Sequence, residues 1–241
     1  MIVLYRIYQL LVMLPVIVVS TIVTAVFTAI GSMLGGSRWW GYWPAKIWSR
    51  LFCWITLVGV TVNGREKIDR NTSYVFVANH QGAYDIFSIY GFLGHNFKWM
   101  MKKSLEKIPF VGWACKHSGQ IFVDNSTPHA IKATMDAAKH QLQGGMSLVV
   151  FPEGARTLDG KLGRFKRGAY TLAIEFGMPV VPVTINGAYE VLPRTGRLPH
   201  WGHITLTIHN PIYPGADGHD LAALMDESRA AIESGLETRY R

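Results

Sequence analysis

A histidine and a carboxylate that could share acid–base chemistry stand five residues apart, at His80 and Asp85. They come directly after the apolar run 74–78, which is typical of a buried strand. A histidine at the end of a core strand can act as a general base, and a nearby carboxylate fixes its tautomer. Residues five apart on a helix point to different faces, so the pair meets only if the chain turns between them. Gly82 allows such a turn, and Asp85 suits the cap of a following helix.

A second group of reactive side chains follows the apolar stretch 147–150. Residues 151–156 read Phe-Pro-Glu-Gly-Ala-Arg, and further cations, among them Lys161 and Arg164, come soon after. Guanidinium groups bind phosphate in a forked geometry. We therefore expect Arg156 to contact an anionic ligand, whereas Lys161 and Arg164 fit a solvated loop equally well.

The elements that must position these residues alternate after residue 63. Apolar runs predict strands at Val60–Val62, Tyr74–Ala78, Phe97–Met101, Gln120–Val123, Ser147–Phe151, Val180–Ile185 and His203–His209. Helical patterns lie at Ile86–Leu93, Phe110–His117, Pro128–Gln143, Lys166–Phe176 and Asp220–Tyr240. This alternation predicts an α/β fold with a mixed, largely parallel open sheet flanked by helices. The apolar alternation of His203–His209 predicts an edge or half-exposed strand, and Pro182 predicts an edge or irregular one.

The N-terminal part has a different character. Residues 7–37 contain no charge, and the apolar stretch Ile7–Leu34 is long enough to cross a bilayer as a helix. The segment 39–62 combines five tryptophans and Tyr42 with Lys46 and Arg50, as membrane interfaces do. A cleaved signal peptide is the competing interpretation, but its apolar region usually spans only about 7–15 residues. Two arrangements remain open: a true span, or a helical pair that dips into one leaflet and bends at the glycines and serines of 31–37. Residues 1–62 are thus predicted to be a membrane-associating helical segment and residues 63–241 an α/β domain.

Charge and composition narrow the partners. The net charge of +8 suits nucleic acid, anionic lipid or a phosphorylated substrate. A membrane segment favours the last two, and no nucleic-acid signature accompanies the charge. Cys53 and Cys115 lack metal-type spacing and favour free thiols. His200 and His203 have no further ligand pattern, so no metal site is expected.

Four blocks of the chain, in this order, resemble the 1-acylglycerol-3-phosphate acyltransferase family of glycerolipid acyltransferases. The blocks are Asn79-His80 with Asp85, Gly119 with Phe122-Val123-Asp124, Phe151-Pro152-Glu153-Gly154-Ala155-Arg156, and Val181-Pro182-Val183. The run Met101-Lys102-Lys103-Ser104-Leu105, with Ile108-Pro109-Phe110-Val111-Gly112 after it, adds to the resemblance. Asn125 stands where the family usually has arginine, and Ala155 where it has threonine or serine. The first departure puts a phosphate role at position 125 in doubt.

The resemblance implies acyl transfer from a thioester, acyl-CoA or acyl carrier protein, to the hydroxyl of 1-acylglycerol 3-phosphate, which yields phosphatidate. No cofactor is implied, and the enzyme would be membrane-associated with its catalytic domain on the cytoplasmic face. His80 would act as base and Asp85 would orient it. Substrate binding would fall to Asn79, Lys102, Lys103, Glu153, Gly154 and Arg156, with Glu153 holding the acceptor or bracing Arg156. Backbone N–H groups near Gly82 or Gly154 could stabilise the oxyanion.

Three rival functions remain. A hydrolase could use Cys115 as nucleophile and His117 as base, although residues two apart do not face each other on a helix. A lipid-binding scaffold without enzymatic activity would leave the His80–Asp85 pair without a task. The same acyl transfer could also act on another acceptor, such as glycerol 3-phosphate or a lyso-aminolipid.

Overall fold

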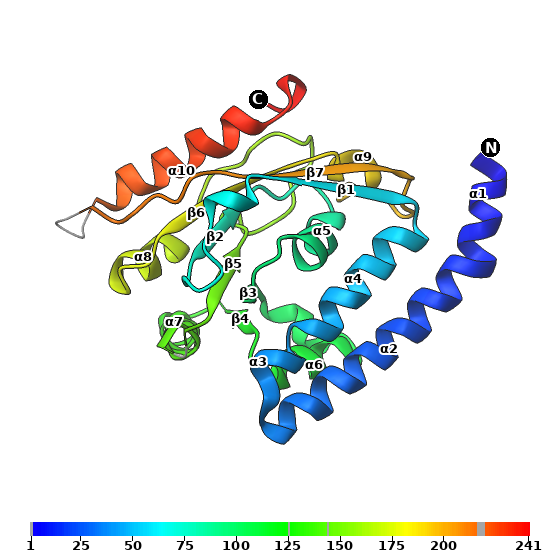
Figure 1. Ribbon diagram of the computed structural model, residues 1–241, viewed down its shortest axis with the longest axis horizontal. Coiled ribbons are helices and arrows are strands. Elements are labelled where there is room, and N and C mark those ends of the chain that lie inside the picture. The colour runs from blue at the N-terminus through cyan, green and yellow to red at the C-terminus, as the bar shows by residue number, and fades with distance from the viewer. Residues whose placement is uncertain (1, 125, 144, 216–219) are drawn as a thin grey trace.

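The computed structural model describes residues 2–124, 126–143, 145–215 and 220–241. Its centre is a seven-stranded sheet in the order β1-β7-β6-β2-β5-β3-β4 (Figure 1). The strands are β1 (Val58–Asn63), β2 (Val75–Ala78), β3 (Phe97–Lys102), β4 (Ile121–Val123), β5 (Ser147–Val150), β6 (Val180–Asn186) and β7 (Gly202–Ile208). Neighbouring strands are parallel except for β6 and β7. The predicted mixed, largely parallel open sheet is confirmed.

Helices cover both faces of the sheet. They are α5 (Tyr84–Phe92), α6 (Val111–His117), α7 (Pro128–Gln143), α8 (Gly168–Glu175), α9 (Ala188–Val191) and α10 (Leu221–Gly235), with the N-terminal helices given below. Strand β2 shows how the two layers arise. Phe76 and Ala78 belong to a core cluster with residues of α5, whereas Val75 and Val77 belong to a second cluster with residues of α7, α8 and α10. A central parallel strand is thus apolar on both faces.

The structure corrects several expected elements. Strand β7 is half-exposed, as its alternation predicts, but it lies between β1 and β6, and β1 forms the edge. Pro182 also lies in an interior strand, β6. The Pro182 carbonyl accepts a hydrogen bond from the His209 N–H at 3.0 Å. The Pro182 nitrogen, which has no hydrogen to donate, points to the same side of β6, just past the end of β7. The hydrogen bonds between β2 and β6 are therefore kept. Helix α9 was not expected, and α10 ends at Gly235 rather than continuing to Tyr240.

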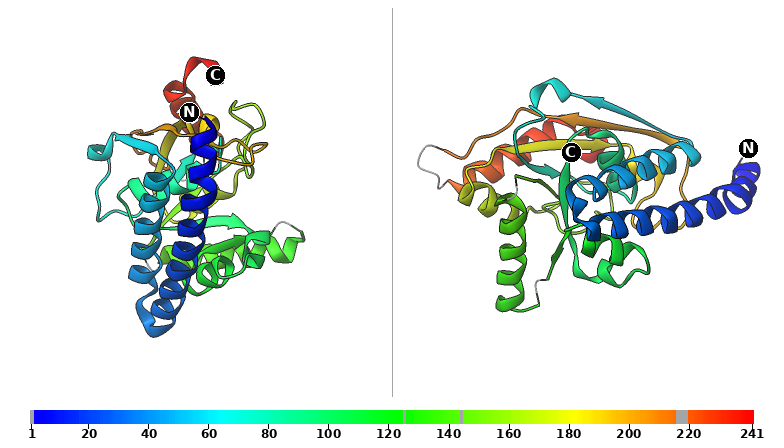
Figure 2. Two further views of the ribbon diagram at one scale, coloured as in Figure 1. Left: turned by 90° about the vertical axis from the view of Figure 1, so that its right-hand side faces the viewer. Right: turned by 60° about the horizontal axis from the view of Figure 1, so that its bottom comes forward.

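A bent pair of helices precedes the sheet (Figure 2). The first consists of α1 (Ile2–Tyr8), a π-helical turn (Gln9–Met13) and α2 (Leu14–Gly31); the return consists of α3 (Ser37–Trp40) and α4 (Trp43–Ile55). The π-helical segment Ser32–Gly36 between them contains Gly35 at φ 99°, a left-handed conformation that suits glycine, so the predicted bend is confirmed. The division between residues 62 and 63 lies inside β1, whereas α4 ends at Ile55.

A buried lysine joins this helical pair to the sheet. Lys98 of β3 is 1% exposed, and its Nζ donates to the carbonyls of Ser37, at 2.9 Å, and Ser118, at 2.6 Å. Ser37 follows the bend, and Ser118 follows α6. Burial lowers the pKa of Lys98 to about 8 because the ammonium has lost most of its hydration.

Candidate active site

His80 and Asp85 meet at the carboxyl end of β2. His80 Nδ1 lies 2.7 Å from Asp85 Oδ2, and the Gly82 N–H donates to the same oxygen at 2.8 Å. An ionised carboxylate only accepts, so Nδ1 carries the proton and Nε2 keeps its lone pair. Asp85 is fully buried, whereas the His80 side chain is 12% exposed. The geometry therefore leaves Nε2 as a base at the surface of the site.

The turn between the two residues forms differently from the sequence-based expectation. Helix α5 begins at Tyr84, so Asp85 lies in its first turn and not at its cap. Gly82 does not have a positive φ. A Cβ there would lie 2.3 Å from the Ala188 carbonyl oxygen, so glycine is required for close packing against α9. An isolated β-bridge joins the same Gly82 to Pro193.

An aromatic platform fixes the plane of the imidazole. The His80 ring stacks on Phe151 with 3.8 Å between centroids and 5° between planes, and Trp99 stacks behind Phe151 at 5.3 Å. Phe151 directly follows β5, which pairs with β2. Because β2 and β5 are parallel neighbours, both reactive segments leave the sheet at one edge. Sequence reasoning missed the role of Phe151, since nothing in its own segment reveals the partner ring.

Glu153 holds the main chain of the site together. Its Oε1 accepts from the His80 N–H at 2.8 Å, and its Oε2 accepts from the Gly163 N–H at 2.7 Å. The Thr157 N–H returns a bond to the His80 carbonyl at 2.9 Å. Burial raises the pKa of the Glu153 carboxyl, and the two N–H donors partly oppose that rise. The expected roles, holding the acceptor or bracing Arg156, are not what the structure shows: each carboxylate oxygen already binds the main chain.

Asn79 is likewise occupied by the main chain. Its Nδ2 donates to the Ile185 carbonyl at 2.8 Å, and its Oδ1 accepts from the Ile185 N–H at 2.7 Å. The residue is 2% exposed. Asn79 therefore anchors the end of β2 to β6, and its amide is not available to a substrate. It is a positioning residue.

The cations expected to bind phosphate lie at the same edge of the sheet. Lys102 ends β3, which pairs with β5, and Arg156 follows β5. Within the described part of the chain, no ion pair or side-chain hydrogen bond engages Lys102 or the Arg156 guanidinium. Lys103, in contrast, pairs with Glu106 at 2.9 Å. Of the three cations expected to bind the acceptor phosphate, Lys102 and Arg156 therefore have no ion pair among the described residues.

Two glycine amides are already occupied. The Gly82 N–H binds Asp85, and the Gly154 N–H donates to the Phe151 carbonyl at 3.0 Å. Gly154 has φ 75°, and a Cβ there would meet Lys166 Nζ at 2.4 Å. Neither N–H is free to bind an oxyanion. Asn125, the departure in the second block, lies outside the described residues.

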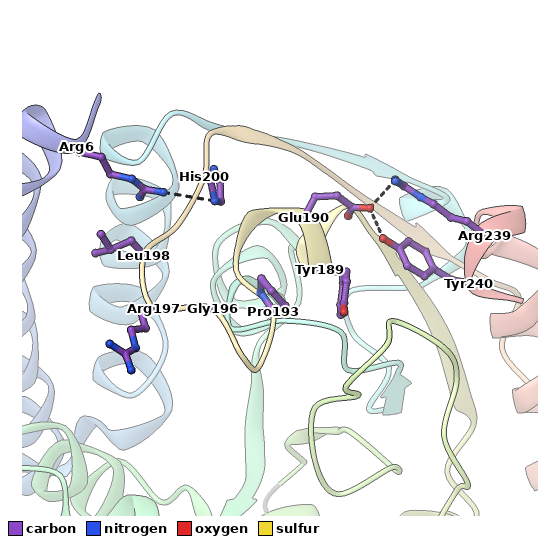
Figure 3. A pocket seen from close by; sticks show the side chains of 10 residues that line it. All are labelled: Arg6, Tyr189, Glu190, Pro193, Gly196, Arg197, Leu198, His200, Arg239 and Tyr240. Carbon is purple, nitrogen blue, oxygen red and sulfur yellow. Dashed lines mark hydrogen bonds and ion pairs between the residues drawn. The ribbon is translucent and has the colours of Figure 1, made fainter. Parts of the chain in front are cut away.

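A separate pocket of about 640 Å³ lies beyond the 188–193 segment (Figure 3). Arg6, Arg197 and His200 line one side of it, and Arg239, paired with Glu190, lines the other. His80, Asp85 and Arg156 do not line it. One of its lining residues, Pro193, is the bridge partner of Gly82.

Comparisons with known proteins agree with this geometry. Residues 59–186 match the family model described as Acyltransferase. A chloroplastic 1-acyl-sn-glycerol-3-phosphate acyltransferase of Brassica napus is 33% identical over 195 residues, which cover 80% of this chain and 55% of that protein. The 1-acyl-sn-glycerol-3-phosphate acyltransferase of Pseudomonas aeruginosa is 30% identical over 189 residues, 76% of this chain and 72% of that protein.

A solved structure gives a fuller match. The 1-acyl-sn-glycerophosphate acyltransferase of Thermotoga maritima superposes with a TM-score of 0.81 at 26% identity, covering 97% of this chain and 93% of that one. The chain spans about half the length of the plant relatives that it matches. The family model nevertheless covers more than half of the chain and includes both blocks that meet at the site. This chain belongs to the acyltransferase family.

Proposed function

We propose that this protein transfers a fatty acyl group from a thioester donor, acyl-CoA or acyl carrier protein, to the free hydroxyl of 1-acylglycerol 3-phosphate, giving phosphatidate. The observation that carries the proposal is the His80–Asp85 pair, whose Nε2 lies at the sheet edge that also holds Lys102 and Arg156. The relatives from Brassica napus and Pseudomonas aeruginosa bear the name of this activity.

The mechanism follows from the free Nε2 atom. His80 Nε2 removes the proton of the acceptor hydroxyl while its oxygen attacks the thioester carbonyl. Asp85 stabilises the imidazolium that forms. Collapse of the tetrahedral intermediate breaks the C–S bond, and the leaving thiolate takes the proton back from the imidazolium. The acceptor is itself the nucleophile, so no covalent acyl-enzyme is needed.

The phosphate of the acceptor supplies the second contact. Lys102 ends β3 and Arg156 follows the neighbouring strand β5, so either cation could bind the phosphate without displacing an ion pair of the described residues. Glu153 and Asn79 contribute indirectly, because they hold the His80 main chain in place. A misplaced base loses catalysis steeply with distance.

The rival hydrolase fits the structure poorly. Burial raises the pKa of the Cys115 thiol to about 11, which keeps it protonated at neutral pH. Its proposed base, His117, instead contacts the Trp113 ring. A cysteine nucleophile needs the thiolate, so Cys115→Ala is expected to leave activity intact while His80→Ala removes it. The reverse result would establish the hydrolase.

We also propose that the helical pair lies in one leaflet on the cytoplasmic side of the membrane. An 18-residue stretch of the helix Ile2–Trp40 has a mean hydropathy of 2.7, and by length and composition this helix could span a bilayer. Both of its ends, however, contact the catalytic domain. Gln9 donates to the Pro199 carbonyl at 2.8 Å, and the far end packs on α6. A helix that crosses the bilayer could not keep both contacts.

One experiment tests the chemistry and the acceptor together. The purified protein is given acyl-CoA or acyl carrier protein in separate arms, each with 1-acylglycerol 3-phosphate, glycerol 3-phosphate or a lyso-aminolipid. Products are identified by mass. Phosphatidate formed from 1-acylglycerol 3-phosphate with either donor supports the proposal. A product only from glycerol 3-phosphate or the aminolipid would move the function to that acceptor, and binding without acyl transfer in any arm would favour a scaffold.

A further inference from the structure

Three large apolar side chains stand exposed on the catalytic domain beside the helical pair. Ile108, Phe110 and Trp113 are 42%, 47% and 39% exposed, and we call them the apolar foot. They lie in the segment that leaves β3 and enters α6. Single exposed apolar residues are ordinary on a protein surface, but three within six residues form a patch that indicates an interaction site.

The backbone of the apolar foot is strained at Phe110. Phe110 has φ 61° and ψ −52°, and the Val111 N–H bonds to the Pro109 carbonyl at 2.6 Å, which is a γ-turn of the rare positive-φ kind. Gly112 packs so closely on the Glu106 carbonyl that a Cβ would lie 2.0 Å from its oxygen. Strain of this kind costs on the order of 1–3 kcal/mol and collects at functional positions. Here it presents an aromatic ring outward on a fixed support.

The apolar foot continues the surface of α2. Helix α6 packs against α2 through three small residues, Ala25, Ala29 and Ala114, so the two helices lie side by side (Figures 1 and 2). The neighbouring face of α2 and its bend is also open, with Phe27 58% and Leu34 83% exposed. Exposed apolar side chains therefore occur both on the helical pair and on the catalytic-domain helix that packs against it.

Two exposed lysines flank the apolar foot. They are Lys107 and Lys116, which lie on either side of it in the sequence. The acidic residue within the same stretch, Glu106, is already paired with Lys103. Apolar side chains flanked by lysines are complementary to a bilayer with anionic head groups, where each basic residue near the surface contributes about 1 kcal/mol.

We propose that the apolar foot is a second membrane-contacting surface, which inserts between the head groups of an anionic bilayer while Lys107 and Lys116 contact lipid phosphates. Its place at the end of β3 has a consequence for the site. The short 3₁₀ helix Lys103–Lys107 connects Lys102 to the apolar foot, so insertion would hold the phosphate-binding edge near head-group level, where a lyso-phospholipid presents its own phosphate. The proposal does not depend on acyl transfer.

A probe of depth tests the proposal without measuring turnover. In a Cys115→Ser background, Phe110→Cys and Ile131→Cys are each labelled with a nitrobenzoxadiazole maleimide. Ile131 is a matched control, 44% exposed on α7, and Cys53 is buried at 1%. The full chain is reconstituted in vesicles of phosphatidylethanolamine and phosphatidylglycerol. Emission from position 110 is expected to shift to the blue and to be quenched by lipids brominated in the acyl chain, and emission from 131 is not.

Two results would overturn the proposal. If the label at position 110 emits at the same wavelength as the label at position 131 and is not quenched by brominated lipid, the apolar foot stays in water. A label at 110 that is shielded but not quenched by brominated lipid shows that protein covers it, either a second copy or another partner.

A matched pair of double variants gives the functional consequence. Phe110→Gln with Trp113→Gln should lower turnover on an acceptor embedded in vesicles about tenfold, and leave turnover on a short-chain, water-soluble acceptor unchanged. Ile131→Gln with Tyr213→Gln, which removes two apolar side chains that are 44% and 67% exposed elsewhere on the domain, should change neither. Equal losses on both acceptors would contradict a membrane role. Insertion at position 110 without turnover on any acceptor would refute the proposed function but not the membrane contact.

Discussion

The carboxylate of Glu153 accepts a hydrogen bond from the main-chain N–H of His80, at 2.8 Å. This contact couples the loop after β5 to the histidine after β2, so the two blocks act as one support. The other carboxylate oxygen of Glu153 accepts from the Gly163 N–H, so the loop that carries Lys161 and Arg164 is held by the same side chain. Glu153, which the sequence suggested as a substrate-binding residue, instead clamps the main chain of His80 to that of Gly163.

Glu153→Gln tests that clamp. Glutamine keeps the shape but offers one acceptor oxygen, so one of the two N–H donors loses its partner, at a cost of about 1–3 kcal/mol. We expect kcat to fall to a similar extent with phosphorylated and unphosphorylated acceptors, because the base moves and the phosphate contact does not. A loss confined to phosphorylated acceptors, seen as a raised KM, would return Glu153 to the role of bracing Arg156.

The clamp also predicts a pH effect on stability. The folded-state pKa of Glu153 is raised, mainly by burial, so its favourable contribution is present below the unfolded pKa and is lost as pH rises through the folded one. The difference in thermal midpoint between the wild type and Glu153→Gln should therefore favour the wild type most at pH values below the unfolded pKa of the Glu153 carboxyl. A difference between the two proteins that does not vary with pH would contradict the raised pKa.

His80→Ala should remove the general base. Turnover is expected to fall by about 10²–10⁴, with little loss of folding, because the side chain makes one ion pair and one ring contact. Asp85→Asn should also reduce kcat, since it no longer selects the tautomer with a free Nε2. His129→Ala, at an exposed position of α7, is the control. Circular dichroism checks the fold, and full activity of His80→Ala would rule out the base.

Arg156→Ala should weaken binding of the acceptor phosphate. A charge-assisted hydrogen bond is worth about 1.5–3 kcal/mol, so KM for a phosphorylated acceptor should rise about ten- to a hundredfold. KM for an unphosphorylated analogue should change little. Arg70→Ala is a matched control, because Arg70 precedes β2 and lies at the opposite edge of the sheet. Equal effects of Arg156→Ala on both acceptors would show that its role is not phosphate binding.

The lowered pKa of Lys98 predicts that the free energy of unfolding increases with pH in the alkaline range. Its folded pKa is depressed from 10.5 to about 8 by burial, so stability is present above the unfolded value and is lost as pH falls through the folded one. The shift corresponds to about 3 kcal/mol. Between pH 8 and 10.5 the wild type should gain stability relative to Lys98→Met, measured as the thermal midpoint in detergent. Lys132→Met, an exposed substitution, should follow the wild type. A parallel profile for Lys98→Met would contradict the depressed pKa.

The sheet could be predicted from the sequence because its strands are continuous apolar runs between clear helical patterns. The expected strands all appear, with ends shifted by one or two residues in most of them, and α7 begins and ends where the sequence predicts. Helix α9 escaped prediction because a single turn leaves no periodic pattern. The interior place of Pro182 also escaped, because it depends on where β7 ends.

By itself, the sequence determined the chemistry at stake. Three local patterns carry it. The spacing of His80 and Asp85 indicates a general base, the Glu-Gly-Ala-Arg block indicates a cation that binds phosphate, and the apolar N-terminus indicates contact with a membrane. Only the tertiary structure decided which side chains face a ligand. Asn79 and Glu153 turn to the main chain, whereas Arg156 and Lys102 stay open, because parallel pairing of β2, β5 and β3 decides which loops adjoin. That pairing joins residues far apart in the chain, and no local pattern records it.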